Sequence, residues 1–244
     1  VEMDLLDPGT PGDGTYSACG SSVLNDPEAG EGLYNESALD LDNDGTPEEE
    51  DEACGDLPYL THEKVVTSFV PMANGNHVVT YEICVMNIGG ADGDYDLYDE
   101  PIFDDDVTIV SASYSCDTDP GAALTIPAPA GGWLLIDDQT IAPGTTQCCE
   151  VVITVNADMS AASGGDNMIT ACGAASGTDD STGGEALHNE SSLDINNDGM
   201  PDEMDEACQD LPVITHEKTL SSVAQQPDGS WCAVYNIVVT NTST

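Results

Sequence analysis

The sequence predicts an all-β protein whose strands form antiparallel β-sandwiches, and three observations support this fold class. Apolar residues alternate with polar ones in several runs, which is the period of a strand with one buried face. Short sequences rich in glycine, proline and asparagine separate these runs, as turns do. No segment carries apolar residues at the spacing of an amphipathic helix.

The clearest predicted strands lie within residues 58–211. Three runs alternate well: "HVVTYEICVMN" (77–87), "DDVTIVSASYS" (105–115) and "CCEVVITVNA" (148–157). Turn sequences lie between the runs, namely "ANGN", "NIGGADGD", "PAPAGG" and "APGTT". In the first and third runs the residues expected to share a face are Val79, Tyr81, Ile83, Val85, Cys149, Val151, Ile153 and Val155. Short strands at this spacing favour a sandwich.

An internal repeat divides the chain. Residues 33–64 match residues 187–218 at an offset of 154, with 22 identical residues in 32 positions. We therefore predict three parts: residues 1–57 end one repeat, residues 58–211 form a complete repeat, and residues 212–244 contain the first strands of the next. Such modules contact mainly their neighbours, so the repeat predicts a linear array.

Residues 64–157 resemble a known family. The pattern Y-x-I-x-V-x-N-x-G, an Asp-x-x-Pro-type segment, a strand ending Ser-Ala-Ser and a Pro-Gly turn are similar to the prokaryotic conserved-repeat Ig-like module, the domain of unknown function eleven. The pattern restarts at Lys218. This resemblance implies a seven-stranded Ig-like sandwich in long surface proteins, without a shared catalytic activity.

The charge balance excludes several classes of partner. The chain has 47 acidic residues against two lysines and no arginine, for a formal charge of −45. Binding of nucleic-acid phosphates or anionic lipid needs cationic side chains, which are nearly absent. No apolar run is long enough to span a bilayer. The surface should instead attract cations.

The stretch "DLDNDGTPEEED" (40–51) has the composition and spacing of a calcium loop. Such a loop needs oxygen ligands at alternate positions around a sharp turn, with glycine at the sixth. The ligands expected in this first loop are Asp40, Asp42, Asp44, the carbonyl of Thr46, Glu48 and Asp51. Those expected in the second loop, "DINNDGMPDEMD" (194–205), are Asp194, Asn196, Asp198, the carbonyl of Met200, Asp202 and Asp205.

Both loops also resemble thrombospondin type-3-like and dockerin-like calcium loops, which read D-x-D-x-D-G-x-P-D. Hard oxygen ligands suit calcium better than zinc or copper. Two departures predict weaker binding: Asn196 replaces an aspartate, and aspartate replaces glutamate at the last position. The alternative interpretation is a solvated acidic loop of the kind found in salt-adapted proteins.

Nine cysteines predict an oxidising compartment. One cysteine precedes and one follows each acidic loop, so we predict the disulfides Cys19–Cys54 and Cys172–Cys208. Each would contribute roughly 3–4 kcal/mol by the chain-entropy estimate. A further candidate pair is Cys116 with Cys148, which leaves Cys84, Cys149 and Cys232 without assigned partners.

Three other features are candidates for modification or binding. Asn35, Asn189 and, as a further candidate, Asn241 begin N-x-S/T sequons, and the first two are expected in exposed loops ahead of the acidic loops. The run from 92 to 106 is either a second calcium site or a polar loop.

The two lysines, Lys64 and Lys218, occupy equivalent positions in the repeat. A single lysine on the first strand of each sandwich suggests an isopeptide bond, with Asn156 or Asp99 as partner. The simpler interpretation is a salt bridge to a nearby carboxylate.

These features predict a structural protein and no enzyme, because the sequence has no nucleophile elbow, phosphate loop or zinc-ligand quartet. We expect tandem sandwiches in an extracellular or cell-surface filament, joined by disulfide-pinned calcium loops. The expected partners are further repeats or copies of the same chain, with covalently attached glycans. The alternatives are the stalk of a large adhesin, a surface-layer protein, or a subunit that polymerises by strand complementation.

Overall fold

The computed structural model describes residues 19, 32–158, 165, 168–173, 185–212 and 214–241, and these residues form an all-β structure. Every paired strand is antiparallel. The strands of the described residues are β1 (Asn35–Leu39), β2 (Glu49–Ala53), β3 (Leu60–Pro71), β4 (His77–Asn87), β5 (Gly93–Pro101), β6 (Val107–Cys116), β7 (Trp133–Ile141), β8 (Thr146–Ala157), β9 (Asn189–Asp194), β10 (Glu203–Ala207), β11 (Ile214–Gln225) and β12 (Trp231–Asn241). The predicted all-β class is confirmed.

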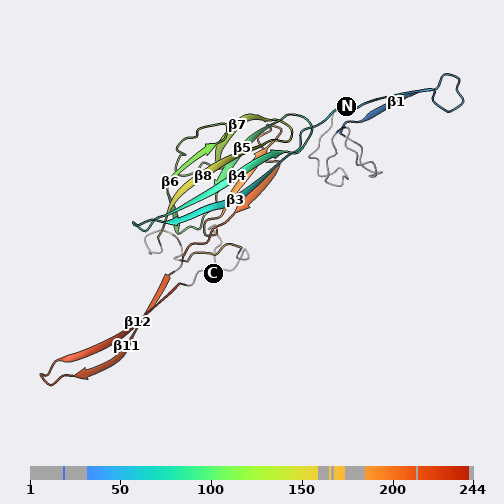
Figure 1. The fold of residues 1–244 in the computed structure, drawn as a ribbon. Coiled ribbons are helices and arrows are strands. Elements are labelled where there is room, and N and C mark those ends of the chain that lie inside the picture. The colour runs from blue at the N-terminus through green and yellow to red at the C-terminus, as the bar shows by residue number, and fades with distance from the viewer. Residues whose placement is uncertain are drawn as a thin grey trace.

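Two four-stranded sheets form the central body in Figure 1. One sheet has the order β3-β4-β8-β6, and the other has the order β10-β9-β5-β7. Strands that are distant in the sequence therefore become neighbours, since β9 pairs with β5 and β8 with β4. This crossing of connections places residues from both ends of the repeat in the same core.

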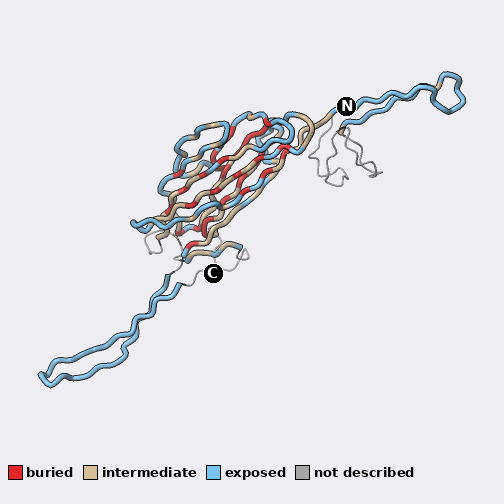
Figure 2. The backbone as a smooth tube through the Cα atoms, viewed as in Figure 1, coloured by how far each residue is buried: buried red, intermediate tan, exposed pale blue. Residues whose placement is uncertain are grey.

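The two sheets share one hydrophobic core, which Figure 2 shows as red segments on the inner strands. The alternating residues expected on one face of β4 and β8 are all buried there. The second sheet contributes Tyr95, Leu97 and Leu193 from β5 and β9. Trp133 closes the core from β7, where its indole N–H donates to the carbonyl of Thr125 at 2.8 Å. Burial of these large side chains is the main stabilising contribution.

The edge strands β3 and β10 meet where the two sheets come together. The backbone N–H of Lys64 on β3 donates to Oδ2 of Asp205 on β10 at 2.7 Å. The N–H of His62 donates in the same way to Oε2 of Glu203 at 3.2 Å. Carboxylates of β10 thus occupy edge donors of β3 that would otherwise be free to pair with another strand.

Two hairpins project from opposite ends of this body (Figure 1). Hairpin β1–β2 repeats the register of β9–β10, since Asn35 lies opposite Ala53 as Asn189 lies opposite Ala207. Hairpin β11–β12 repeats the register of β3–β4 at the same offset of 154, with its β-bulge at the equivalent position. Every residue of the four strands β1, β2, β11 and β12 is exposed, as the pale blue tubes of Figure 2 show.

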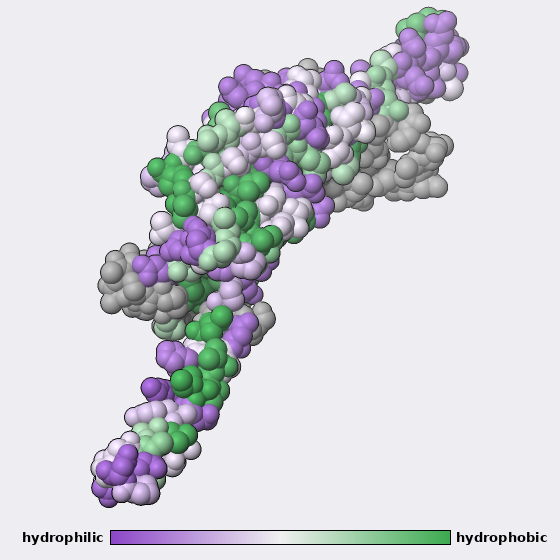
Figure 3. All heavy atoms as spheres, turned by 60° about the vertical axis from the view of Figure 1, so that its left-hand side comes forward, coloured by the Kyte–Doolittle hydropathy of each residue, from purple (hydrophilic) through white to green (hydrophobic). Residues whose placement is uncertain are grey.

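Hairpin β11–β12 exposes apolar side chains whose equivalents in β3–β4 are largely buried. Ile237 and Val239 are 58% and 65% exposed, whereas the equivalent Ile83 and Val85 are almost fully buried. Figure 3 shows hydrophobic residues gathered along this hairpin.

Candidate metal loops and a buried lysine

The first acidic loop is organised around Asp40. Its Oδ1 accepts the N–H of Asn43 at 2.7 Å, and its Oδ2 accepts the N–H of Gly45 at 2.9 Å. These N–H groups, that of Gly45 above all, lower the pKa of Asp40 below its usual range. Asn43 and Gly45 have φ of 61° and 89°, which bends the chain around the carboxylate; asparagine and glycine tolerate this left-handed conformation.

Four carboxylates gather in this loop. Asp40, Asp42, Asp44 and Glu48 each offer an oxygen, and these oxygens all lie within 4.8 Å of one another. Glu48 is held there because its Oε2 accepts the N–H of Leu41 at 2.6 Å. Four negative charges this close repel one another strongly unless a cation lies between them. The group therefore has the donor set that a hard divalent cation needs.

The second loop has the same backbone design. Asp194 Oδ2 accepts the N–H of Gly199 at 2.8 Å, as Asp40 does for Gly45. Asn197 and Gly199 have φ of 57° and 81°, close to the values in the first loop. Asp202 takes the place of Glu48, and its Oδ2 accepts the N–H of Ile195 at 2.7 Å. The two copies thus reach one turn geometry with different side chains.

Asp194 differs from Asp40 in its surroundings. It is only 2% exposed, and its Oδ1 has no hydrogen-bond partner among the described residues. It lines a pocket of about 340 Å³ together with Tyr98, Met200 and Pro201. A buried carboxylate oxygen without a partner is costly, so its position beside the loop is an argument for a bound cation.

The two residues expected as ligands at the twelfth position lie in the strands after the loops, and their role as ligands stays a prediction. Asp51 lies in β2 opposite Ser37, outside the group of four carboxylates. Asp205 lies in β10, where its carboxylate accepts the N–H groups of Lys64 and Glu206. Each loop passes into a strand before the twelfth position, so the compact ligand group of the first loop ends at the ninth.

The remaining expected ligands take part in hydrogen bonds between backbone N–H groups and side-chain oxygens within each turn. The N–H of Thr46 donates to Asp44 Oδ1 at 2.8 Å, and the N–H of Met200 donates to Asp198 Oδ1 at 2.8 Å. Asn196 Oδ1 accepts the N–H of Asp198 at 2.9 Å. Ligation by the carbonyls of Thr46 and Met200 remains a prediction.

A disulfide flanks each acidic loop. Cys19 is bonded to Cys54, and Cys172 is bonded to Cys208, with Cα–Cα distances of 5.9 and 5.8 Å. The contacts around the two bridges also match. The N–H of Cys19 donates to Asp56, and that of Cys172 donates to Asp210, the residue equivalent to Asp56 in the repeat.

The predicted pair Cys116–Cys148 is wrong. Cys148 is bonded to Cys84 on β4, and Cys149 is bonded to Cys116 on β6. In the register of the sheet, Cys84 lies opposite Cys148 and Cys116 lies opposite Cys149. Consecutive residues of a strand point to opposite faces, so Cys148 and Cys149 cannot exchange partners. The described residues contain four disulfides, which are typical of a protein outside the reducing cytoplasm.

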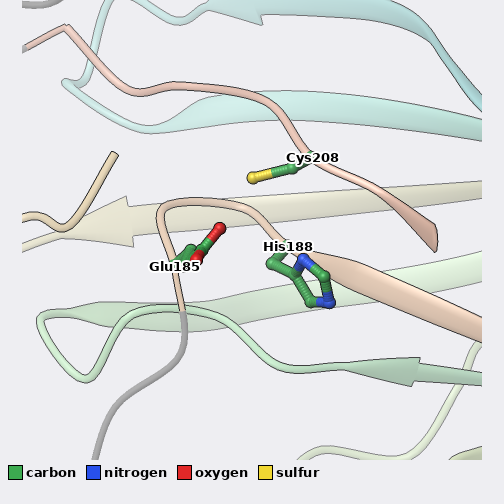
Figure 4. A group of neighbouring side chains, drawn as sticks. All are labelled: Glu185, His188 and Cys208. Atoms are coloured by element: carbon green, nitrogen blue, oxygen red, sulfur yellow. The ribbon is translucent and has the colours of Figure 1, made fainter. Parts of the chain in front are cut away.

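Three other groups of ligand-type side chains lie among the described residues, and one of them consists of His188, Glu190 and Glu206. Glu185, His188 and Cys208 lie close together (Figure 4), but the sulfur of Cys208 is already bonded to Cys172. Asp104 and Asp106 form a buried acidic group with Asp105, inside the run considered as a second calcium site. Burial raises the pKa of Asp104, while its carboxylate accepts the N–H of Thr170 at 2.8 Å.

The three sequon asparagines lie in different surroundings. Asn35 is exposed in β1, and Asn241 is exposed at the end of β12. The expectation of an exposed loop is wrong for Asn189, which is fully buried in β9. Its Nδ2 donates to Oδ2 of Asp99 at 3.2 Å, so the folded module offers no room for a glycan there.

Lys64 is buried, and its Nζ contacts Oδ1 of Asp99, which is also completely buried. Asn156, the other partner considered for this lysine, donates its Nδ2 to Asn76 instead. Burial lowers the pKa of Lys64, and the negative charge of Asp99 only partly offsets this effect. The sequence signal for this site was the single lysine per repeat, but nothing in the sequence singled out Asn189 as its third member.

No protein-family model matches the chain, and no curated protein matches it. The resemblances of the sequence motifs therefore remain predictions. Within the described part of the chain, no helix is long and apolar enough to cross a membrane.

Proposed function

We propose that the chain is a stretch of a structural protein of the cell surface, in which Ig-like modules follow one another and form a filament or fibril. Calcium and disulfides stiffen the segment at the end of each module. Its partners are further repeats of the same chain or other copies of it. The role is mechanical, without catalysis, and consists of reach, stiffness and resistance to proteolysis.

The observation that supports this proposal best is that one group of structural features recurs at an offset of 154 residues. The acidic loop, the strand pair that flanks it, and the disulfide behind it recur together. The hydrophobic core lies between Leu60 and Leu211, which fits one module of 58–211. A chain that repeats both module and junction is suited to building length.

Calcium would serve this array in two ways. Within the first loop it would neutralise the carboxylates of Asp40, Asp42, Asp44 and Glu48 and hold the turn in one conformation. Over the whole chain it would offset part of the repulsion that follows from a charge of −45.

Polymerisation by strand complementation is a second candidate, and the exposed face of hairpin β11–β12 favours it. The equivalent strands β3 and β4 bury their apolar side chains against β5, β7 and β9. The hairpin needs the same cover, either from a following part of its own chain or from another copy. An adhesin stalk and a surface layer are assemblies in which such modules would also serve.

Electron microscopy of the native material, with calcium and after chelation, tests the proposal. We expect thin filaments that become limp or break when calcium is removed. Denaturation distinguishes the two forms of assembly, because a covalent array stays as one long chain whereas strand complementation gives a ladder of units. Compact monomers that are unchanged by chelation would contradict both the filament and the calcium role.

A further inference from the structure

A carboxylate in the core connects two strands that lie in different sheets. One oxygen of Asp99, on β5, contacts the Nζ of Lys64 on β3. The other oxygen accepts the Nδ2 of Asn189, on β9, at 3.2 Å. Because both oxygens belong to one carboxylate, the amine of Lys64 and the side-chain amide of Asn189 are held next to each other.

The strand register explains why these residues meet. β5 and β9 pair so that Asp99 lies opposite Ser191 and Pro101 lies opposite Asn189. Asn189 is therefore a diagonal neighbour of Asp99 on the same face of the sheet. Lys64 reaches the pair from the first strand of the other sheet, 125 residues earlier in the chain.

The site is sealed from water. The side chains of Lys64 and Asp99 are both fully buried, and Asn189 is fully buried as well. The aromatic ring of Tyr81 covers Lys64, with Nζ 5.4 Å from the ring centroid. The carbonyl oxygen of Asn189, Oδ1, has no hydrogen-bond partner among the described residues.

A static ion pair does not account for these features. A buried lysine–aspartate pair carries a large desolvation cost and is at best weakly stabilising. Here the pair is accompanied by an amide whose carbonyl oxygen is left without a donor, which adds a further cost. The site brings together an amine, an amide and a carboxylate that can carry a proton. These three groups are the components of an amide-exchange reaction.

We propose that Lys64 and Asn189 become joined by an amide bond between Lys64 Nζ and Asn189 Cγ, and that Asp99 mediates the proton transfers. Asp99 takes a proton from the Lys64 ammonium, and the neutral amine attacks Cγ of Asn189. The protonated Asp99 stabilises the oxygen that becomes negative and then protonates the departing amino group. The C–N bond to Nδ2 breaks and one ammonia leaves. Asp99 takes the second proton from the attacking nitrogen, so the product is a neutral amide beside a protonated Asp99.

Two physical conditions favour this step. Burial already lowers the pKa of Lys64, which increases the fraction of the nucleophilic neutral amine. The three groups are fixed by the packed core, so the reaction is intramolecular and needs no cofactor or energy source. The product replaces two buried charges and an unpaired carbonyl by one neutral amide and a neutral carboxylic acid that can bond to it.

The bond would join the first strand of the module to one of its last. Tension on the ends of residues 58–211 would then pass through the link between Lys64 and Asn189, and the strands between them would bear little of it. Lys218 and Asn35 occupy the equivalent positions at the offset of 154. Neighbouring modules of an array would therefore carry the same lysine and asparagine.

Intact mass and tryptic digestion of the full chain test the proposal. After reduction and alkylation of all cysteines, the mass should be lower than the sequence mass by one ammonia. The chain has no arginine and only two lysines, so trypsin has two expected cleavage sites. The denatured chain should be cut after Lys218 and not after Lys64, because an acylated lysine is not a trypsin site. A second protease should release one branched peptide that contains both Lys64 and Asn189.

Variants assign the roles within the site. Asn189→Ala should restore the full mass and the cleavage after Lys64, whereas the matched control Asn156→Ala should keep the link. Asp99→Asn should leave the lysine and the asparagine unlinked. The measurement on the unaltered chain does not depend on the folding of any variant.

Three results would overturn the proposal. The full sequence mass with cleavage after both lysines would show a simple ion pair. Loss of one water, with Lys64 joined to Asp99, would show that the partner of Lys64 is Asp99 and not Asn189. Loss of ammonia with Lys64 and Asn189 in separate peptides would indicate cyclisation of an asparagine instead.

Discussion

Asp40 and Asp194 occupy equivalent positions in the two acidic loops, but only Asp194 is buried. Asp40 is half-buried within its own loop, after the exposed strand β1, while Asp194 lies at the end of β9 beside the core. A partly desolvated carboxylate binds a cation more strongly, since water competes less well for the site. Burial therefore partly compensates for the asparagine at position 196.

The first prediction concerns this residue. Asp194→Asn should weaken calcium binding at the second loop by about tenfold or more, because it removes one charged ligand of a divalent ion. Isothermal titration of the full chain would measure this change. Glu150→Gln is the matched control, since it removes one exposed charge outside the groups of candidate ligands. Equal affinities of the two variants would contradict a role of Asp194 as a ligand.

The second prediction concerns pH. Burial raises the pKa of Tyr95 to about 12, and its hydroxyl donates to Oε1 of Gln147 at 2.8 Å. In the unfolded chain a tyrosine ionises near pH 10. Between these two pH values the unfolded state loses the proton and the folded state keeps it, so the free energy of unfolding falls as pH rises.

Denaturant unfolding between pH 9 and pH 12 would measure this effect. Tyr95→Phe should flatten the alkaline part of the stability profile, while Tyr59→Phe serves as a control for a less buried tyrosine. An unchanged alkaline slope in Tyr95→Phe would assign the loss of stability to other groups.

At the scale of elements, β8 is tied to both of its neighbours by consecutive cysteines. Cys148 bonds to β4 on the outer face of the sheet, and Cys149 bonds to β6 on the inner face, where it is 3% exposed. The two bridges differ clearly in their access to solvent. The lengths of the loops that they close make only a small difference to their stabilising contribution. Loop lengths of 64 and 33 residues change the chain-entropy contribution by only about 0.6 kcal/mol.

The third prediction is therefore an order of reduction. Under mild reducing conditions the bridge Cys84–Cys148 should open before Cys116–Cys149, because a thiol must reach a sulfur to attack it. Timed alkylation followed by peptide mass spectrometry would identify the labelled cysteines. Earlier labelling of Cys149 would mean that the inner face of β8 opens more readily than the packed core allows.

At the scale of the whole molecule, one acidic loop precedes the two-sheet body in the chain and the other follows β9 within it, and we propose that both bind calcium. A ligand that binds only the folded state stabilises it, by about 2.7 kcal/mol at a concentration one hundred times its dissociation constant. For a module of this size such a change shifts the melting temperature by about 5–10 °C. Stiff junctions also protect the chain from proteases.

The fourth prediction is that chelation lowers the melting temperature by this amount and exposes residues 40–51 and 194–205 to a protease specific for acidic residues. Calorimetry and timed digestion would measure both effects. Sodium chloride at matched ionic strength is the control, because screening alone should not restore protection. Full recovery with sodium chloride would show that the loops need screening and no bound divalent ion.

Much of this protein follows from local patterns in its sequence. Alternation of apolar residues was enough to predict the buried faces of β4 and β8, since a strand places every second side chain on the same side. The spacing of glycine and aspartate predicted the turn of each acidic loop, because only a few residues adopt the required backbone conformation. One cysteine on each side of each acidic loop was enough to predict the disulfides Cys19–Cys54 and Cys172–Cys208.

Only the tertiary structure decided which distant residues meet. The partners of Cys148 and Cys149 depend on β8 lying between β4 and β6, an order that no local pattern contains. The strands β2 and β10 begin before the twelfth loop position, so Asp51 and Asp205 lie in strands, which the loop pattern did not predict. Lys64, Asp99 and Asn189 come together because β3, β5 and β9 converge on one core, and such contacts arise from the packing of the two sheets rather than from nearness in the chain.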